Sequence, residues 1–252
     1  MEKLLSVHSL CKTYILKGSS NNVLRGIDLD IGKGEFVCVM GPSGSGKSTL
    51  LYTISGMDAM TAGSVTFDGK DISKLGKKEL AYLRLNEMGF IFQQMYMLKK
   101  LCILDNILLP GFQAGGDRRK VRERAEQLMR RLGIIECAEN ETTEVSGGQL
   151  QRACLCRALI NEPKMIFADE PTGALNSKAA EEVMHELIEA NKAGTAVLMI
   201  THSVKVAARS ERVLYLMDGD ICGELELGRL ENENDLSKRE RMLGTWLMDK
   251  GW

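Results

Sequence analysis

A glycine-rich segment, Gly41-Pro-Ser-Gly-Ser-Gly-Lys-Ser-Thr49, carries the residue types that bind a polyphosphate. It follows the apolar run Phe36–Met40 and precedes the apolar run Leu50–Ile54, so a buried strand should lead into the segment and a helix should follow it. Glycines let successive N–H groups point into one concavity, and the helix N-terminus adds the positive end of its dipole. The spacing G-x-x-x-x-G-K-S arises by chance in about one in a hundred chains of this length. We therefore expect a phosphate-binding loop rather than a flexible turn.

The polar residues of this phosphate loop have separate expected roles. Lys47 should reach the β- and γ-phosphates, the Ser48 hydroxyl should bind Mg²⁺, and Thr49 should bond the α-phosphate. Tyr14 can stack on a nucleotide base, although an isolated tyrosine near a loop is more often a packing or surface residue. The expected nucleotide-binding residues are Tyr14, Gly41, Ser43, Gly44, Ser45, Gly46, Lys47, Ser48 and Thr49.

An acidic pair, Asp169-Glu170, ends the apolar run that starts at Met165. Ligands bind at the carboxyl ends of parallel strands, so Asp169 can hold Mg²⁺ directly or through water. Glu170 should lie on the opposite side of the strand, where it can polarise a water in line with the γ-phosphate. Without the phosphate loop, the pair would be interpreted as a plain strand end before Pro171.

Two further polar residues end predicted strands. Gln93 follows the strand 88–92, which should lie beside the phosphate-loop strand, so its amide can reach the metal or the attacking water; Gln94 is the alternative. His202 ends the strand 196–202 and can donate to the γ-phosphate, although a histidine at such a place is ordinarily a core residue. The expected catalytic residues are Glu170, His202 and Gln93, and the expected Mg²⁺ ligands are Ser48, Gln93 and Asp169.

A second anion site is predicted at Val145-Ser-Gly-Gly-Gln149, which we call the signature segment. It offers the Ser146 hydroxyl, the amides of Gly147 and Gly148, Gln149 and the start of a helix. It lacks a lysine and lies in a helical region away from the phosphate loop. It can complete a phosphate shell but cannot bind a nucleotide alone, so a second copy of the chain should supply it.

Composition limits the classes of partner. The 252 residues carry 33 Lys and Arg against 34 Asp and Glu, a net charge of −1, so nucleic acid is not an expected partner. The seven cysteines are scattered without C-x-x-C spacing, as in free thiols of a reducing cytosol, without zinc or disulfides. There is no signal-peptide pattern and no membrane-spanning apolar run, so any membrane role should come through a partner chain.

Strand and helix patterns alternate along the chain, which predicts an α/β fold with a doubly wound parallel sheet. Residues 3–14 and 23–31 predict an antiparallel β layer, joined by a polar loop at 18–22. From about 94 to 161 the patterns are helical and predict an insert in the core. The resulting domain is residues 1–227, with a core of 1–93 and 162–227 and a helical subdomain of about 94–161.

A C-terminal tail, residues 228–252, follows this domain. Its hydrophobic residues stand at helical spacing and should cover the chain's own core, with a partner contact as the alternative: Trp246, Leu247, Met248 and Trp252.

The order of these motifs resembles the nucleotide-binding subunit of an ATP-binding cassette (ABC) transporter over about residues 3–225. Three segments, 24–28, 90–94 and 169–173, most resemble the lipoprotein-release and macrolide-export branch. The tail resembles Gram-positive exporters of the bacitracin and antimicrobial-peptide type. The phosphate loop, Gln93, the signature segment, Asp169-Glu170 and His202 carry the resemblance in the family's order.

The resemblance implies a P-loop NTPase with a RecA-like parallel-sheet core, an antiparallel β layer and a helical insert subdomain. It implies an ATPase in which two copies sandwich two ATP, with Mg²⁺, between the phosphate loop of one and the signature segment of the other. Tyr14 would stack on adenine. It also implies a peripheral protein at the cytoplasmic face of the cell membrane, bound to a separate permease with a large extracytoplasmic domain, for export or defence against antimicrobial peptides or lipophilic compounds.

Two positions depart from the family pattern. Val145 replaces the usual Leu, a small packing change, and Asn176 replaces the usual Asp at the end of the loop 173–176.

Two other hypotheses for the function stay open. A soluble ABC protein acting on DNA ends or ribosomes would carry long coiled-coil inserts or two cassettes, which this chain lacks. A regulatory ABC protein of cell division or signalling is disfavoured by Glu170 and His202 but kept open by Asn176.

Overall fold

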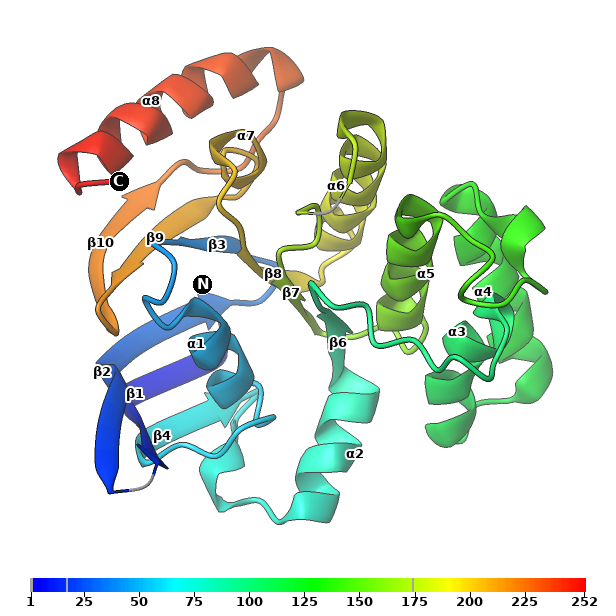
Figure 1. Cartoon of the computed structure of the whole chain (residues 1–252), viewed down its shortest axis with the longest axis horizontal. Coiled ribbons are helices and arrows are strands. Elements are labelled where there is room, and N and C mark those ends of the chain that lie inside the picture. The colour runs from blue at the N-terminus through cyan, green and yellow to red at the C-terminus, as the bar shows by residue number, and fades with distance from the viewer. Residues whose placement is uncertain (1, 17, 174) are drawn as a thin grey trace. The chain divides into compact units, whose positions relative to one another are not determined.

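The computed structural model describes residues 2–16, 18–173 and 175–252 (Figure 1). It divides into two compact units. The first comprises Met1–Leu80 and Ala196–Trp252, and the second comprises Ala81–Thr195. The phosphate loop and His202 belong to the first unit, whereas the signature segment and the acidic pair belong to the second.

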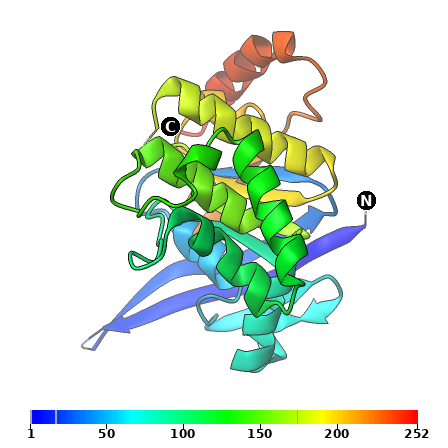
Figure 2. The same ribbon diagram turned by 90° about the vertical axis from the view of Figure 1, so that its right-hand side faces the viewer.

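An antiparallel sheet forms one layer of the first unit. Its order is β2-β1-β4-β5, with β1 (Lys3–Leu16), β2 (Ser19–Gly32), β4 (Ala62–Phe67) and β5 (Lys70–Asp71). The predicted antiparallel layer is confirmed. The predicted polar loop at 18–22 is wrong, because Ser19–Asn22 continue β2 and pair with the end of β1. These residues are solvent-exposed, so polar side chains fit the extended hairpin, drawn in blue in Figure 2.

Parallel strands form the core of the first unit. β3 (Phe36–Met40) pairs in parallel with β8 (Ala196–Ile200) on one edge and with β9 (Arg212–Met217) on the other. β10 (Asp220–Glu226) lies antiparallel to β9. All residues of β3 and β8 are buried, as expected for continuous apolar runs in a parallel sheet. The segments that follow β3 and β8 therefore leave the sheet at the same edge.

The helices of the first unit are short, apart from the one nearest the C-terminus. They are α1 (Lys47–Ile54), the 3₁₀ turn η1 (Ile72–Lys74), α7 (Val204–Ala207), η3 (Glu233–Asp235) and α8 (Leu236–Asp249). A further helix, α2 (Lys77–Glu87), begins in the first unit and ends in the second.

The second unit combines two parallel strands with helices. β6 (Met88–Ile91) pairs with β7 (Met165–Asp169). The other elements are α3 (Ile103–Gln113), α4 (Arg118–Arg131), the 3₁₀ turn η2 (Ile135–Cys137), α5 (Gly147–Leu159) and α6 (Ser177–Lys192). α5 contacts α3, α4 and α6, and Figure 2 shows this packing in green and yellow.

The strand partners correct one prediction. The strand before Gln93 was expected beside the phosphate-loop strand, but both edges of β3 are occupied, by β8 and β9. β6 pairs with β7 instead. Periodicity shows that a segment is a buried strand but does not specify its neighbours, so the expected adjacency was wrong.

Helix α8 covers β9 and β10 in the first unit, where Figure 1 draws it in red beside the orange strands. Leu243 and Leu247 are completely buried, whereas Met248 is 75% exposed. Gly223 of β10 permits this approach, because a Cβ there would lie 3.0 Å from the Trp246 ring. The prediction that the tail covers the chain's own core is confirmed for Leu247 and wrong for Met248, which points to solvent.

The buried Arg239 fastens α8 to the segment before β9. Its guanidinium donates to the carbonyl oxygens of Ala208, Ser210 and Gly228. Burial lowers the pKa of Arg239, yet three carbonyl acceptors satisfy the charged group. The tail is therefore an integral part of the first unit.

We expect Leu247→Ala to lower the free energy of unfolding by about 2–5 kcal/mol, because it leaves a cavity under α8. The neighbouring change Met248→Ala should alter it by less than about 0.5 kcal/mol, since this side chain is exposed. Urea denaturation of both variants measures the difference. Equal, small effects would show that α8 does not contribute to the core in solution.

Candidate functional site

The phosphate loop lies where neighbouring backbone leaves no room for a side chain. A Cβ on Gly41 would come within 1.9 Å of the Leu216 carbonyl oxygen. Gly44 and Gly46 have φ of 82° and 103°, a left-handed conformation that favours glycine, and Gly46 is the N-cap of α1. The glycine spacing is therefore required by the shape of the loop.

The turn between β9 and β10 supports the loop from behind. The Gly219 N–H donates to the Ser45 carbonyl at 3.1 Å, and the Arg25 N–H donates to the Gly219 carbonyl at 2.9 Å. A Cβ on Gly219 would lie 2.2 Å from the Val23 carbonyl oxygen. Backbone from β2 and from the β9–β10 turn thus fixes the loop without side-chain packing.

The chemistry of the loop suits a polyphosphate. Lys47 begins α1, and its ammonium donates to the carbonyls of Gly41 and Pro42 at 2.8 Å each. The first turn of α1 has no acidic residue, so its dipole is not neutralised there. The Ser45 hydroxyl is buried and finds no hydrogen-bond partner among the described residues. An ammonium at the start of a helix whose first turn carries no acidic residue fits a phosphate ligand.

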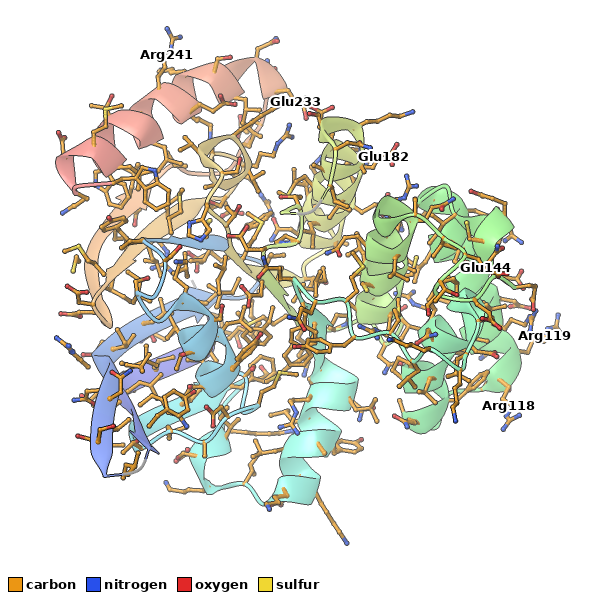
Figure 3. All side chains as sticks on the ribbon, in the orientation of Figure 1. Arg118, Arg119, Glu144, Glu182, Glu233 and Arg241 are labelled. Atoms are coloured by element: carbon orange, nitrogen blue, oxygen red, sulfur yellow. The ribbon has the colours of Figure 1, made fainter. Side chains whose placement is uncertain are left out.

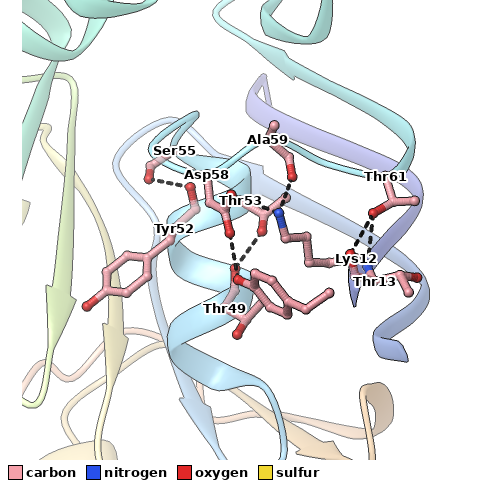
Figure 4. A network of polar contacts seen from close by, with 10 residues as sticks. Lys12, Thr13, Thr49, Tyr52, Thr53, Ser55, Asp58, Ala59 and Thr61 are labelled. Atoms are coloured by element: carbon pink, nitrogen blue, oxygen red, sulfur yellow. Dashed lines mark hydrogen bonds and ion pairs between the residues drawn. The ribbon is translucent and has the colours of Figure 1, made fainter. Parts of the chain in front are cut away.

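Tyr14 is held by a polar network at the edge of the antiparallel layer. Its hydroxyl donates to Asp58 Oδ2 at 2.6 Å, and Lys12 donates to Asp58 Oδ1 at 2.8 Å and to the Ala59 carbonyl at 2.6 Å (Figure 4). Thr49 of α1 also hydrogen-bonds the Tyr14 side chain. The Lys12 ammonium lies 4.6 Å from the centre of the Tyr14 ring. The ring is thereby tied to the first turn of α1.

The charges in this network set the protonation of its members. Burial, aided by the hydrogen bond to Asp58, raises the pKa of Tyr14, so the phenol stays neutral at physiological pH. Burial alone would raise the pKa of Asp58, but the hydrogen bonds from Lys12 and Tyr14 outweigh it and hold that pKa below its usual value. The aspartate stays ionised and orients both of its donors.

His202 lies level with the start of the phosphate loop. β8 ends at Ile200, which pairs with Val39, and the Thr201 N–H donates to the Val39 carbonyl at 3.4 Å. His202 is therefore two residues past the strand end and not inside it as predicted. It is exposed, so the alternative of a buried core histidine is wrong.

The acidic pair lies in the second unit. Asp169 is the last residue of β7 and is buried. Glu170 follows the strand with a φ of 48°, a left-handed conformation rare for a residue with a side chain. Such strain, of about 1–3 kcal/mol, is common at functional sites. Alternation of side chains holds only inside a strand, so the expectation that Glu170 faces the other side of the strand stays a prediction.

The signature segment forms the N-terminus of α5. The Ser146 hydroxyl accepts from the Gln149 N–H at 3.3 Å, and the Gln149 side chain accepts from the Ser146 N–H at 2.8 Å. This capping box satisfies two groups of the helix end. Ser146 and Gly147 are exposed, and a Cβ on Gly147 would meet no atom within 4 Å. The segment therefore has an open face.

Asn176 is the N-cap of α6. Its side-chain oxygen accepts from the Ala179 N–H at 3.0 Å. Asn and Asp cap helices about equally well, which explains why Asn is tolerated here. Ala174, in the same loop, lies outside the described residues.

The loop after Gln93 is anchored to α5. Gln93 and Gln94 are exposed and follow the end of β6. The Arg157 guanidinium of α5 donates to the carbonyls of Tyr96 at 2.9 Å and Met95 at 2.8 Å. The loop backbone is thus fixed while Tyr96 is 62% exposed.

Sequence reasoning missed three residues that position the site. Lys12 and Asp58 are far apart in sequence, so no local pattern connects them. Gly219 lies in the Asp-Gly turn between β9 and β10. An Asp-Gly turn indicates a hairpin, but its contact with the phosphate loop depends on tertiary structure.

The chain is similar in sequence to ABC transporter proteins. Residues 24–173 match the family model described as ABC transporter. The chain is 40% identical over 245 residues to the bacitracin export ATP-binding protein BceA of Halalkalibacterium halodurans, covering 96% of this chain and 97% of that protein. It is 41% identical over 203 residues to the lipoprotein-releasing system ATP-binding protein LolD of Aquifex aeolicus, covering 81% and 91% respectively.

A solved structure extends the comparison to the fold. The dimeric ATP-binding cassette MJ0796, in a post-hydrolysis state bound to ADP and Pi, superimposes with a TM-score of 0.85 at 36% identity. The match covers 90% of this chain and all of that one. The predicted α/β P-loop NTPase class, the ATPase activity and the resemblance to ABC transporter subunits are confirmed. The chain belongs to the ABC transporter family, as an ATP-binding and ATP-hydrolysing subunit that dimerises and works with a membrane permease.

Proposed function

We propose that the residues named from the sequence carry out this ATPase reaction. Gly41, Ser43, Gly44, Ser45, Gly46, Lys47, Ser48 and Thr49 would bind the phosphates, and Tyr14 would stack on adenine. Glu170 would act as the general base, His202 would donate to the γ-phosphate, and Gln93 would orient the attacking water. The observation that carries the proposal is the phosphate loop, whose left-handed glycines lead directly to Lys47 at the start of α1.

The proposal includes Mg²⁺. A hydroxyl (Ser48), an amide oxygen (Gln93) and a carboxylate (Asp169) are the oxygen ligands that Mg²⁺ prefers, so the donor set fits the ion. When bound, the ion would neutralise charge on the β- and γ-phosphates.

A second copy of the chain would complete each site. Its Ser146, Gly147, Gly148 and Gln149 would meet the γ-phosphate held by the first copy. Two features support this: the open face at Gly147 and the exposed Ser146. Phosphate oxygens can replace the capping-box acceptor at the N-terminus of α5.

The relatives suggest the transported material. BceA is named for bacitracin export, and other relatives are named for macrolide export and lipoprotein release. We infer a role in export, or in defence against antimicrobial peptides or lipophilic compounds. The partner would be a separate permease with a large extracytoplasmic domain, and the subunit would act at the cytoplasmic face of the cell membrane. Among the described helices, none has the length and apolarity to cross a bilayer.

The permease would bind the segment Gln94–Leu109 at its exposed part. Tyr96 and Leu98 are 62% and 50% exposed, and Lys99 and Lys100 are exposed beside them, whereas Ile107 and most other apolar residues of α3 are buried in the second unit. A fixed loop that exposes Tyr and Leu suits docking of a helix.

One alternative function has a specific basis. Asn176 in place of Asp favours a regulatory ABC protein of cell division or signalling with little transport. The N-cap hydrogen bond of Asn176 argues against impaired ATP hydrolysis, since it preserves the local structure of α6.

The ATPase assignment is tested with Glu170→Gln. Loss of the general base should lower turnover by about 10² to 10⁴ and trap an ATP-bound dimer, which size-exclusion chromatography with Mg²⁺ and ATP would detect. Lys47→Ala should instead lose nucleotide affinity and stay monomeric. A Glu170→Gln protein that remains monomeric at high protein and ATP concentrations would contradict the sandwich.

Charge reversal tests the docking segment. Lys99→Glu with Lys100→Glu should reduce pull-down of the permease while basal ATPase activity is unchanged, since neither residue belongs to the ATP site. Arg118→Glu with Lys120→Glu on α4, where Figure 3 shows Arg118 extending outward, changes the net charge equally and should keep binding. An equal loss of permease pull-down in both double variants would refute a local docking surface.

Restoring the family residue tests Asn176. Asn176→Asp should change turnover by less than about tenfold, because the cap and the proposed base are retained. Asn176→Ala should lower stability by about 1 kcal/mol through loss of the cap. A gain of a hundredfold in the Asp variant would favour the regulatory function over transport.

A further inference from the structure

Trp252, which follows α8, contacts His202 within the first unit. The ring centroids are 5.9 Å apart, and the ring planes are inclined by 31°. Trp252 also lies 6.2 Å from the Tyr215 ring in an edge-on arrangement, and Tyr215 makes a similar contact with Trp246 at 6.3 Å. A continuous aromatic cluster therefore joins helix α8 to the histidine beside the phosphate loop.

The end of α8 fixes the position of Trp252. Gly251 has a φ of 84°, and its N–H donates to the Met248 carbonyl at 3.0 Å. The Trp252 N–H donates to the Leu247 carbonyl at 3.0 Å. These two bonds and the left-handed glycine form a Schellman motif, which reverses the chain sharply at a helix end. The turn fixes the backbone of Trp252, and its ring, 42% exposed, packs against His202 and Tyr215.

The strand register brings the cluster next to the phosphate loop. Val39 of β3 pairs with Ile200 of β8, and Met40 pairs with Tyr215 of β9. Tyr215 therefore stands on β9 and His202 follows the end of β8, and these two strands flank β3 close to the residue where the phosphate loop begins. Trp252 touches both residues.

We propose that Trp252 is a positioning residue for His202. It restricts the exposed imidazole to the orientation that meets the γ-phosphate, so ATP bound at the phosphate loop changes the environment of the indole. The proposal rests on the proposed function, in which His202 contacts the γ-phosphate. Contact with the indole limits rotation of the imidazole, which reduces the conformational entropy lost when it binds the γ-phosphate.

Kinetics of Trp252 variants test the positioning role. Trp252→Ala should lower kcat by about two- to tenfold, the effect of freeing one side chain, with the Kd for ATP unchanged. Trp252→Phe should restore most of the rate, since a ring remains. Met248→Ala, an exposed change on the same helix, is the matched control and should behave as the parent. An unchanged or increased kcat for Trp252→Ala would overturn the proposal.

Gly251→Ala addresses the case in which Trp252→Ala is poorly folded. This variant keeps the indole but strains the left-handed turn that positions it, so kcat should fall in the same direction while thermal unfolding reports the fold. A folded Gly251→Ala protein with the parent's kcat would count against the proposal.

Fluorescence gives a readout that a purely structural role would not affect. The chain has two tryptophans, so Trp246→Phe leaves Trp252 as the single emitter. In the Glu170→Gln background, ATP with Mg²⁺ should change its emission, and His202→Ala should abolish the change. If His202→Ala turns over ATP as the parent does, the proposed role of His202 fails. If His202→Ala loses turnover while ATP does not change Trp252 emission in the protein that retains His202, only the positioning role of Trp252 fails.

Discussion

Close backbone contact around the phosphate loop is the constraint on which the rest of the first unit depends. The Leu216 carbonyl of β9 occupies the space where a side chain at position 41 would stand, and the Val23 carbonyl does the same at Gly219. The Lys47 side chain adds hydrogen bonds to the loop carbonyls of Gly41 and Pro42, so backbone contacts and one buried side chain together shape the loop. A loop fixed in this way would lower the cost of binding a phosphate. The β9–β10 hairpin and β2 thus support the loop that we propose binds the phosphates.

The sequence predicts local features well because they follow from local physics. Glycine spacing specifies the phosphate loop, and continuous apolar runs specify buried strands such as β3 and β8. Strand neighbours are different: nothing in the segment 88–92 indicates that it pairs with β7 and not with β3. Alternation of side chains predicts directions only inside a strand, and Glu170, with its left-handed backbone, lies just beyond the end of β7.

Part of the candidate site also depends on contacts between distant residues. Lys12 and Asp58 meet around Tyr14 only because β1 lies beside the segment after α1. The C-terminal tail also contains contacts that its sequence pattern does not predict. Helical spacing groups Met248 with Leu247 and Trp252, but Met248 faces solvent, while the turn at Gly251 brings Trp252 back to His202.

Helix α5 connects two proposed functions of the second unit. Its N-terminus carries the signature segment, where Ser146 and Gln149 satisfy each other, and Arg157 near its C-terminus holds the backbone of Met95 and Tyr96. A phosphate at the N-terminus would exchange one set of hydrogen bonds for another, so the net gain for each bond is small, about 0.5–1.5 kcal/mol. A rigid helix that is displaced at one end would shift as one body. The backbone of Met95 and Tyr96, held by Arg157, would then move with α5, and this would link the proposed ATP contact to the surface proposed for the permease.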